Sequence, residues 1–284
     1  RYRVDHLIEA YADTLPDAEK DAVIANMEEL LKENDYAGLK KFIEDKKIVC
    51  GVSGTGNWTD IRQFNLMFST QLGSVAEEAS EIYLRPETAQ GIFVNFLNVQ
   101  KTGRMKIPFG IAQVGKAFRN EIVARQFVFR MREFEQMEMQ FFVRPGTQQE
   151  WYAYWKEERM KWHKSLGLKP EHLQYHDHAK LAHYADAAVD IEYNFPIGFK
   201  EVEGIHSRTD FDLSQHQQYS GKKMQYFDPE INQNYIPYVV ETSIGLDRCC
   251  LMVLSEAYEE QDLSTGDKQD SRVVLKFPPK LAPI

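Results

Sequence analysis

The sequence has few cysteines, no long apolar run and no excess of positive charge. Its 284 residues include only Cys50, Cys249 and Cys250. An odd and sparse cysteine count argues against a disulfide framework and for a reducing compartment, so we expect a cytoplasmic protein. No run is long and apolar enough to span a membrane, and the first residues lack the apolar core of a signal peptide. We therefore expect no membrane association.

Positive charge is scarce, because 34 basic residues stand against 43 acidic ones and the net charge is −9. A general nucleic-acid coat would be basic, so the composition disfavours that class of protein. It does not exclude an enzyme that binds nucleic acid through a local basic strip or a separate domain. The length fits one large domain or two ordinary ones, and 43% hydrophobic residues are typical of a globular protein.

Two extended segments, residues 109–121 and 128–143, carry the most informative pattern. In the second segment, alternate residues from Phe134 to Gln140 form a largely polar face, and the residues between them form an apolar one. A period of two predicts a β-strand. If the segments pair antiparallel, their polar faces make a floor of arginine, glutamate and glutamine, suited to a ligand with an anionic and a cationic end. The alternative is a solvated face with cross-strand ion pairs.

Helical spacing alternates with these strands. Residues 1–48 predict a small helical insertion or appendage, with a helix start at 16–19, and residues 88–99 and 147–165 predict further helices. Residues 235–243 predict a strand that turns into a helix at 245–248. Because the strands come in hairpin-like pairs without regular βαβ spacing, we predict an α+β fold. Its antiparallel sheet is flanked by helices and is not doubly wound.

Histidines and one cysteine raise the question of a metal site. His172, His176, His178 and His183 lack the same-face i, i+4 spacing of a helical zinc site, so we interpret them as hydrogen-bonded residues. Cys50 is followed three positions on by Ser53, where a zinc knuckle needs a second thiolate. We therefore expect no zinc.

Three stretches carry a resemblance to a known family. Phe118-Arg119-Asn120-Glu121, with Phe129-Arg130 and the run from Arg132 to Glu138, resembles motif 2 of class II aminoacyl-tRNA synthetases. The strand, Gly-Leu-Asp-Arg turn and apolar helix from residue 235 onward resemble motif 3. The run Arg-Glu-Phe-Glu-Gln-Met-Glu is similar to glycyl-tRNA synthetases of the homodimeric type. The string Leu-Arg-Pro-Glu-Thr-Ala-Gln-Gly at 84–91 supports the same family.

The resemblance implies a class II catalytic core at residues 49–275, after the helical appendage at 1–48. Residues 276–284 would be a linker toward an anticodon-binding domain that this sequence does not contain, and motif 1 has no clear match. The implied reaction attaches glycine to tRNA(Gly) through glycyl-adenylate, with ATP and Mg²⁺, in a homodimer. Two alternatives are a class II enzyme for another small amino acid and a non-catalytic accessory protein that binds nucleic acid.

The motif match also implies site residues. Arg119 and Arg248 would be catalytic, with Arg119 at the α-phosphate and Arg248 stacked on adenine, and Glu201 is a possible Mg²⁺ contact. The expected ATP-binding residues are Arg119, Asn120, Glu121, Phe129, Arg130, Met131, Arg132, Glu133, Phe134, Glu201, Val202, Gly245, Leu246, Asp247 and Arg248. The expected glycine-binding residues are Glu87, Phe134, Glu135, Gln136, Met137, Glu138, Glu241, Thr242, Ser243, Ile244 and Gly245.

Overall fold

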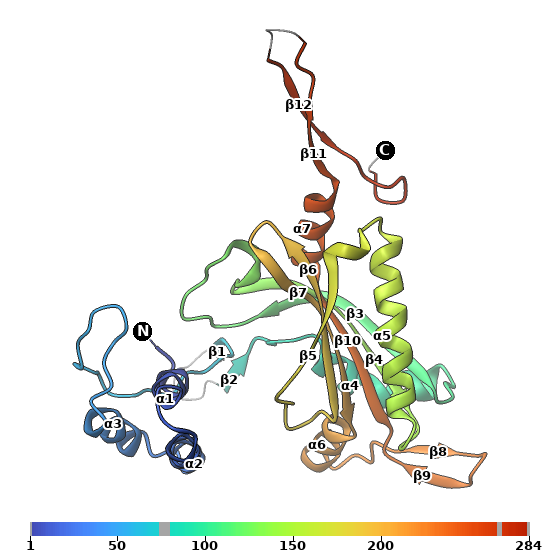
Figure 1. Cartoon of the computed structure of the whole chain (residues 1–284). Helices are drawn as coiled ribbons and strands as arrows, with labels where there is room; N and C mark the ends of the chain where they lie inside the picture. Colours follow the sequence, from blue (N-terminus) through green and yellow to red (C-terminus); the bar gives the residue numbers. More distant parts are fainter. Residues whose placement is uncertain (1, 74–79, 266–268, 283–284) are drawn as a thin grey trace. The chain divides into compact units, whose positions relative to one another are not determined.

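The computed structural model describes residues 2–73, 80–265 and 269–282. It divides the chain into two compact units, Arg1–Asn65 and Leu66–Ile284, whose elements are labelled in Figure 1. None of the helices in the described residues combines the length and the apolar character that crossing a membrane requires.

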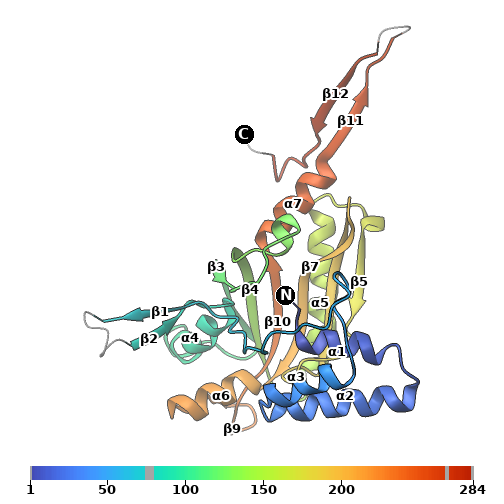
Figure 2. The same cartoon turned by 90° about the vertical axis from the view of Figure 1, so that its left-hand side faces the viewer.

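The first unit is helical, as the sequence predicts for residues 1–48. It contains α1 (Val4–Ala12), α2 (Asp17–Lys32) and α3 (Tyr36–Asp45), drawn in blue in Figure 2. Apolar residues from all three helices, among them Ile8, Met27 and Leu39, form its core. Residues 49–65 belong to this unit, whereas the sequence analysis groups them with the catalytic core. They are held there by the Trp58 ring, which packs on the helical core and donates from Nε1 to the Ile48 carbonyl at 2.8 Å.

The second unit is built on a six-stranded sheet with the order β3-β4-β10-β7-β6-β5. Every neighbouring pair in it is antiparallel, so the predicted antiparallel sheet is confirmed. Its strands are β3 (Phe109–Phe118), β4 (Glu133–Val143), β5 (Leu173–Asp177), β6 (Ala187–Phe195), β7 (Gly198–Thr209) and β10 (Tyr238–Gly245).

The two motif segments pair as predicted, but β3 ends at Phe118 and not at residue 121, and β4 begins at Glu133 and not at residue 128. Before it, the chain forms the short 3₁₀ helix η2 (Phe127–Phe129). Gln126 and Phe127 have φ of 60° and 53°, a left-handed conformation that a strand does not accommodate. Phe129 and Arg130 therefore precede the strand and are not part of it.

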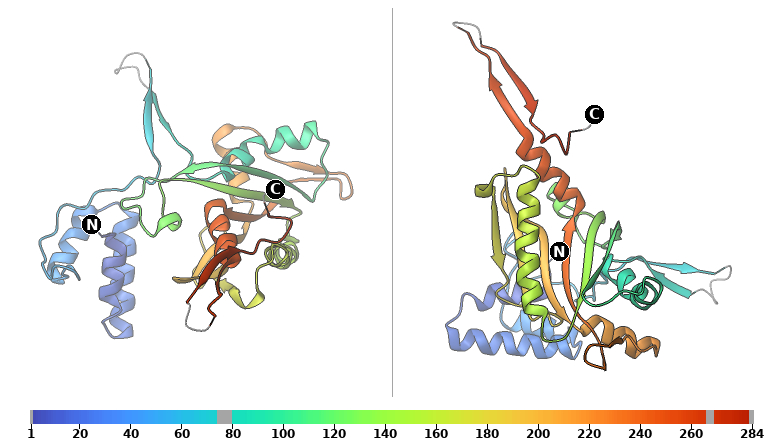
Figure 3. Two further views of the ribbon diagram at one scale, coloured as in Figure 1. Left: turned by 90° about the horizontal axis from the view of Figure 1, so that it is seen from above. Right: turned by 90° about the vertical axis from the view of Figure 1, so that its right-hand side faces the viewer.

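Helices cover both faces of the sheet. On one face α5 (Gln148–Ser165) and α7 (Leu246–Ala257) enclose a core that includes Ile191, Ile205 and Met252, and Figure 3 shows α5 lying along the strands. Trp151 and Trp155 of α5 pack on Phe141, with ring centroids 4.9 and 5.2 Å away. The helix predicted at residues 147–165 is therefore confirmed, and its tryptophans pack on the sheet.

On the opposite face, α4 (Ala89–Thr102) and α6 (Phe211–Ser220) cover one end of the sheet. Their shared core is aromatic: the Phe142 ring lies 4.6 Å from Phe96 and 5.3 Å from Phe109. Phe142 has the same parity along β4 as Gln140 and Glu138, so this cluster closes one end of the polar face and leaves the rest for a cavity.

Three two-stranded pairs complete the unit. They are β1 (Ser69–Leu72) with β2 (Ser80–Tyr83), β8 (Tyr226–Asp228) with β9 (Gln233–Tyr235), and β11 (Tyr258–Asp262) with β12 (Ser271–Leu275). A second 3₁₀ helix, η3 (Pro170–His172), precedes β5. The β11–β12 pair projects from the end of α7, drawn in red in Figure 1.

Candidate active site

The polar floor predicted from two strands extends across further strands of the sheet. Strand register brings residues from distant parts of the chain into line, because opposed residues of antiparallel strands share a face. One row across β3, β4, β10 and β7 consists of Gln113, Glu138, Ser243 and Gly204. The next row, across β4, β10 and β7, consists of Gln140, Glu241 and His206.

A cavity of about 210 Å³ lies on this floor. Most residues expected from the sequence line it, in both the ATP and the glycine groups. They are Glu87, Arg119, Glu121, Phe129, Arg130, Met131, Phe134, Glu135, Gln136, Glu138, Glu201, Glu241, Ser243, Gly245, Asp247 and Arg248.

Other expected residues do not line the cavity. Val202 and Ile244 belong to the apolar core on the other face, and Met137 packs against that core. The guanidinium of Arg132 bonds instead to the carbonyls of Glu121 and Ile122. The other expected residues that do not line the cavity are Asn120, Glu133, Leu246 and Thr242.

Strand alternation explains part of this division. The sequence match transfers whole motif strings, whereas successive side chains of a strand point to opposite faces of the sheet. Glu133 has the opposite parity to Phe134, and it forms an ion pair with Lys116.

The structure also brings in residues that the sequence analysis did not assign. These are Val128, Tyr184, Gly204, His206 and Arg208 in the cavity wall, together with Thr88, which bonds to Glu138. Arg208 pairs with Asp212, but the first lies at the end of β7 and the second in α6, so no helix spacing in the sequence signals the pair. Tyr184 and Thr88 reach the site through tertiary packing, which leaves no local pattern.

Arg208 and Glu241 form a buried ion pair behind the cavity, with 4% and 3% of their surfaces exposed. Nη1 of Arg208 lies 3.2 and 3.0 Å from the two carboxylate oxygens of Glu241. The other edge of the guanidinium binds Asp212 in a bidentate pair at 2.8 and 3.0 Å. The guanidinium carbon also lies 4.1 Å from the Tyr184 ring centroid. The planar guanidinium thus binds Asp212 through one edge and Glu241 through another donor, a fork geometry that the ammonium of a lysine does not offer.

The carboxylate of Glu241 has further partners. Gln140 Nε2 donates to it at 2.6 Å, and His206 Nδ1 lies 3.0 Å from its Oε1. Burial alone would raise the pKa of Glu241, but the charge of Arg208 and the bond with His206 outweigh burial and lower the pKa. Glu241 is therefore ionised, and its charge is already compensated inside the protein.

Glu138 lies one row away and is in a different state. Its side chain is 3% exposed, and it accepts hydrogen bonds from the hydroxyls of Ser243, at 2.9 Å, and Thr88. Within the described residues no basic side chain forms an ion pair with it. Burial, and then the nearby charge of Glu241, raises its pKa despite these two hydroxyls. A buried acid without a counter-charge favours a ligand that brings a positive charge.

The two predicted catalytic arginines are anchored by main-chain carbonyls. Arg119 Nε donates to the Pro86 carbonyl at 3.1 Å, and its guanidinium carbon lies 5.2 Å from the Phe134 ring centroid. Arg248 donates to the carbonyls of Glu201, at 2.9 Å, and Phe129, at 3.0 Å. Such anchors orient a planar cation. Arg248 Nη1 also lies 3.3 Å from Oε2 of the half-exposed Glu201, so the charge of Arg248 is partly compensated, and its planar group remains suited to an aromatic ligand.

Asp247 fixes the start of α7, where Arg248 lies. Its Oδ2 accepts from the Glu135 backbone N–H at 3.0 Å, which ties the helix to β4. An acid in the first turn is also favourable for the helix dipole and offsets the small cost of placing Arg248 there. The motif 3 turn therefore has a structural function beside its arginine.

The buried pair gives a stability prediction. Replacement Glu241→Gln leaves Arg208 buried with half of its counter-charge, so we expect the free energy of unfolding to fall by about 3 kcal/mol. Urea unfolding followed by tryptophan fluorescence measures this, because three of the four tryptophans lie in α5. The control is Glu133→Gln, which breaks the exposed pair with Lys116 and should change little. Equal effects of both variants would show that the Arg208–Glu241 pair is not stabilising.

Comparison with known proteins agrees with this geometry. The family profile of the tRNA synthetase class II core domain (G, H, P, S and T) matches residues 68–257, and that of the glycyl-tRNA synthetase insertion domain 1 matches residues 14–66. A solved structure of Giardia lamblia prolyl-tRNA synthetase in complex with prolyl-adenylate matches with a TM-score of 0.52 and 21% identity. The match covers 67% of this chain and 37% of that one, and it supports the fold alone.

Curated relatives are more similar in sequence. The glycine--tRNA ligase of Chlorobaculum tepidum is 54% identical over the whole chain and that of Macrococcus caseolyticus 53%, matching 61% and 59% of their own lengths. That of Treponema denticola is 56% identical over 84% of the chain. The chain thus spans about 60% of the length of such relatives, and the resemblance predicted from the motifs is confirmed. The chain belongs to the class II tRNA synthetase core family.

Proposed function

We propose that this chain is the catalytic part of an enzyme that attaches glycine to tRNA(Gly) with ATP. One observation carries the proposal: Glu138, a buried acid without a counter-charge, shares a cavity with Arg119 and Arg248, two cations held by main-chain carbonyls. One end of this cavity suits an ammonium group and the other a nucleotide. The glycine--tRNA ligases among the relatives support the choice of substrate.

The first step joins glycine to AMP. A carboxylate oxygen of glycine attacks the α-phosphorus of ATP, the new O–P bond forms, and the bond to the bridging oxygen breaks as pyrophosphate leaves. Glycine is already ionised at its carboxylate, so this step needs no general base. Its barrier is lowered by positioning and by charge stabilisation. Arg119 supplies the positive charge beside the α-phosphate.

The second step moves the glycyl group to the tRNA. A hydroxyl of the terminal ribose attacks the glycyl carbonyl carbon, its proton is lost, and AMP leaves with the electrons of the broken C–O bond. The cavity walls keep the adenylate in place between the two steps. The enzyme must therefore bind glycyl-adenylate at both ends, at the ammonium group and at the adenine.

Adenine recognition is assigned to Arg248 and Phe129. The guanidinium carbon of Arg248 lies 5.5 Å from the Phe129 ring centroid. Planar guanidinium and aromatic groups both stack on a purine. Glu121, which also lines the cavity, supplies a carboxylate acceptor for the exocyclic amino group.

Mg²⁺ fits a carboxylate at the nucleotide end of the cavity. Glu201 lines the cavity with 52% of its side chain exposed, and its Oε2 lies 3.3 Å from Arg248 Nη1. Mg²⁺ is usually held by one or two carboxylates together with phosphate oxygens, so Glu201 can contribute one ligand. When bound, the ion would neutralise charge on the departing pyrophosphate.

Glycine is held at Glu138 in this proposal. Its carboxylate, positioned by Thr88 and Ser243, receives the substrate ammonium. Glu241 was expected from the sequence to share this contact. Because Arg208, His206 and Gln140 already bind its oxygens, we assign it to the layer behind Glu138. Selectivity for glycine then follows from the exclusion of larger side chains, since attraction alone cannot reject them.

The wider setting follows from the same proposal. The chain acts as part of a homodimer in the cytoplasm and receives tRNA(Gly) as its partner. The three free cysteines are consistent with a reducing compartment.

Amino-acid-dependent ATP–pyrophosphate exchange tests the function. With the 284-residue chain we expect exchange with glycine and at least a hundredfold less with alanine, serine or proline. Calorimetry with non-hydrolysable aminoacyl-adenylate analogues of the same four amino acids provides a binding readout that needs no turnover. Preference for alanine, serine or proline in both assays would assign the enzyme to another amino acid. A folded chain that binds none of the analogues would contradict catalysis altogether.

Adenine stacking gives a separate prediction. Replacement Arg248→Lys keeps the charge and removes the planar group, so the KM for ATP should rise about tenfold if stacking contributes on the order of 1–2 kcal/mol. The control is Arg272→Lys on β12, where the guanidinium bonds to Gln261 and ATP use should be unchanged. An unaltered KM for ATP in Arg248→Lys would remove the arginine from the adenine site.

A further inference from the structure

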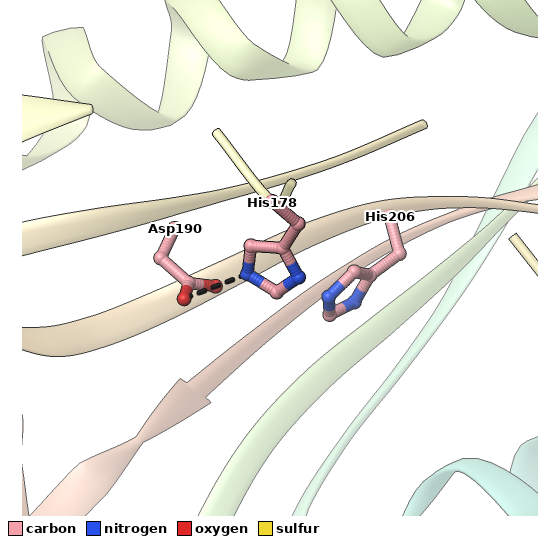
Figure 4. A group of neighbouring side chains, drawn as sticks. All are labelled: His178, Asp190 and His206. Atoms are coloured by element: carbon pink, nitrogen blue, oxygen red, sulfur yellow. Dashed lines mark ion pairs between the residues drawn. The ribbon is translucent and has the colours of Figure 1, made fainter. Parts of the chain in front are cut away.

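A group of metal-ligating side chains lies further along the same polar face of the sheet. His178, Asp190 and His206 each offer one ligand atom within 4.8 Å of the others, and all three are partly buried. Figure 4 shows the His178 ring between the Asp190 carboxylate and the His206 ring. The three residues come from separate segments: His178 follows β5, Asp190 lies in β6 and His206 in β7.

Sheet register assembles the group. Asp190 is opposite Gly204 and Ala188 is opposite His206 in the β6–β7 pair, while the His178 backbone N–H donates to the Ala188 carbonyl at 3.3 Å. Alternation therefore sends the side chains to the face that also carries Glu241. The i, i+4 spacing expected of a helical zinc site, against which residues 172–183 were compared, cannot reveal this group, because its three ligands come from different segments.

His206 is oriented as a metal ligand would be. Its Nδ1 lies 3.0 Å from Oε1 of the ionised Glu241, which leaves Nε2 as the nitrogen without that partner. Histidines that bind metals nearly always donate the other ring N–H to a carboxylate or carbonyl, which fixes the tautomer and raises basicity.

Gly204 lies beside two of the three ligands. A Cβ at this position would lie 3.4 Å from Asp190 Oδ1, 3.5 Å from His206 Nε2 and 2.9 Å from His206 Cε1. A side chain here would therefore press on the His206 ring, and glycine avoids that contact.

We propose that His178, Asp190 and His206 bind a divalent transition-metal ion of the zinc class, with an open coordination position toward the cavity. Two imidazoles and one carboxylate are a typical three-ligand zinc set that leaves a fourth place free. Mg²⁺ prefers oxygen ligands, so this site differs in chemistry from the one proposed at Glu201. The sequence-based expectation of no zinc concerned local spacing only.

The ligand atoms, which lie within 4.8 Å of one another, must rearrange on binding. His178 Nε2 and Asp190 Oδ2 are 2.8 Å apart, whereas two ligands of a tetrahedral zinc ion are about 3.3 Å apart. The side chains must therefore separate by about half an ångström as the ion replaces a shared proton. The bound ion holds His206 with its N–H toward Glu241, and so connects the metal to the network behind Glu138.

The alternative is a hydrogen-bonded triad that never takes a metal. Metal titration of the intact chain distinguishes the two after chelator treatment and dialysis. The Cys50 thiol can also take zinc, because hydrogen bonds with Ser53 and Tyr2 lower its pKa to about 6. Cys50→Ser is therefore the parent for all measurements.

Calorimetric titration of this parent with Zn²⁺ should show one ion per chain. His178→Ala and the nearly isosteric Asp190→Asn should each weaken binding at least a hundredfold. The matched control is His176→Ala, since that ring also pairs with a carboxylate, Glu192 at 3.1 Å, but is not in the three-residue group. X-ray absorption of the zinc-loaded parent should show two imidazole ligands. Zn²⁺ should raise the Tm of the parent and of His176→Ala, but not of His178→Ala.

Absence of stoichiometric zinc binding in the parent would overturn the proposal. So would equal losses in His176→Ala and His178→Ala. Circular dichroism identifies a variant that fails to fold, and Asp190→Asn then decides the question. None of these readouts uses aminoacylation, so the proposal stands or falls separately from the proposed function.

Discussion

The buried pair of Arg208 and Glu241 is the interaction on which the cavity depends. Two buried charges are costly to desolvate, and their attraction repays this only when the geometry is good and the remaining hydrogen-bonding positions are filled. Both conditions are met here, since Asp212, Gln140 and His206 occupy those positions. The pair joins β7 to β10 and, through Asp212, to α6, so it fixes the back wall of the site.

The Arg208–Glu241 pair also gives two neighbouring acids, Glu241 and Glu138, different charge states. Glu241 is compensated by Arg208 and stays ionised. Among the residues that the structure describes, the partners of Glu138 are hydroxyls and an amide, and its pKa is raised. Had both acids been compensated, the cavity would have little attraction for an ammonium group. Had neither been, mutual repulsion would have raised both pKa values and weakened the fold. One compensated acid behind one uncompensated acid gives a stable protein that still attracts a cation.

The sequence contained enough to predict the architecture and the two ends of the site. Alternation in residues 128–143 and the lack of βαβ spacing led to the antiparallel sheet. The motif strings singled out Arg119 and Arg248, and both line the cavity. These features are local, so they can be read from neighbouring residues. The late start of β4 was missed because Gln126 and Phe127 adopt a left-handed conformation that their side chains do not signal.

The back wall could not be predicted, for a related reason. Arg208, Tyr184 and His206 meet Glu241 only through strand register and packing between β6, β7 and β10. Likewise, the grouping of His178 with Asp190 depends on three segments, and histidine spacing in one segment is uninformative about it. Motif strings also assign too many residues to the site, because some of their members, such as Val202 and Ile244, belong to the apolar core on the other face of the sheet.

The most direct test of the account is whether glycine displaces a proton from Glu138. Because its pKa is raised, Glu138 holds a proton to higher pH than an ordinary glutamate, and a neighbouring ammonium favours its ionised form. Calorimetry of glycine binding beside a non-hydrolysable ATP analogue, near neutral pH in buffers of different ionisation enthalpy, counts the protons exchanged. The account predicts net proton release that disappears in Glu138→Gln. No release, or the same release in Glu138→Gln, would contradict it.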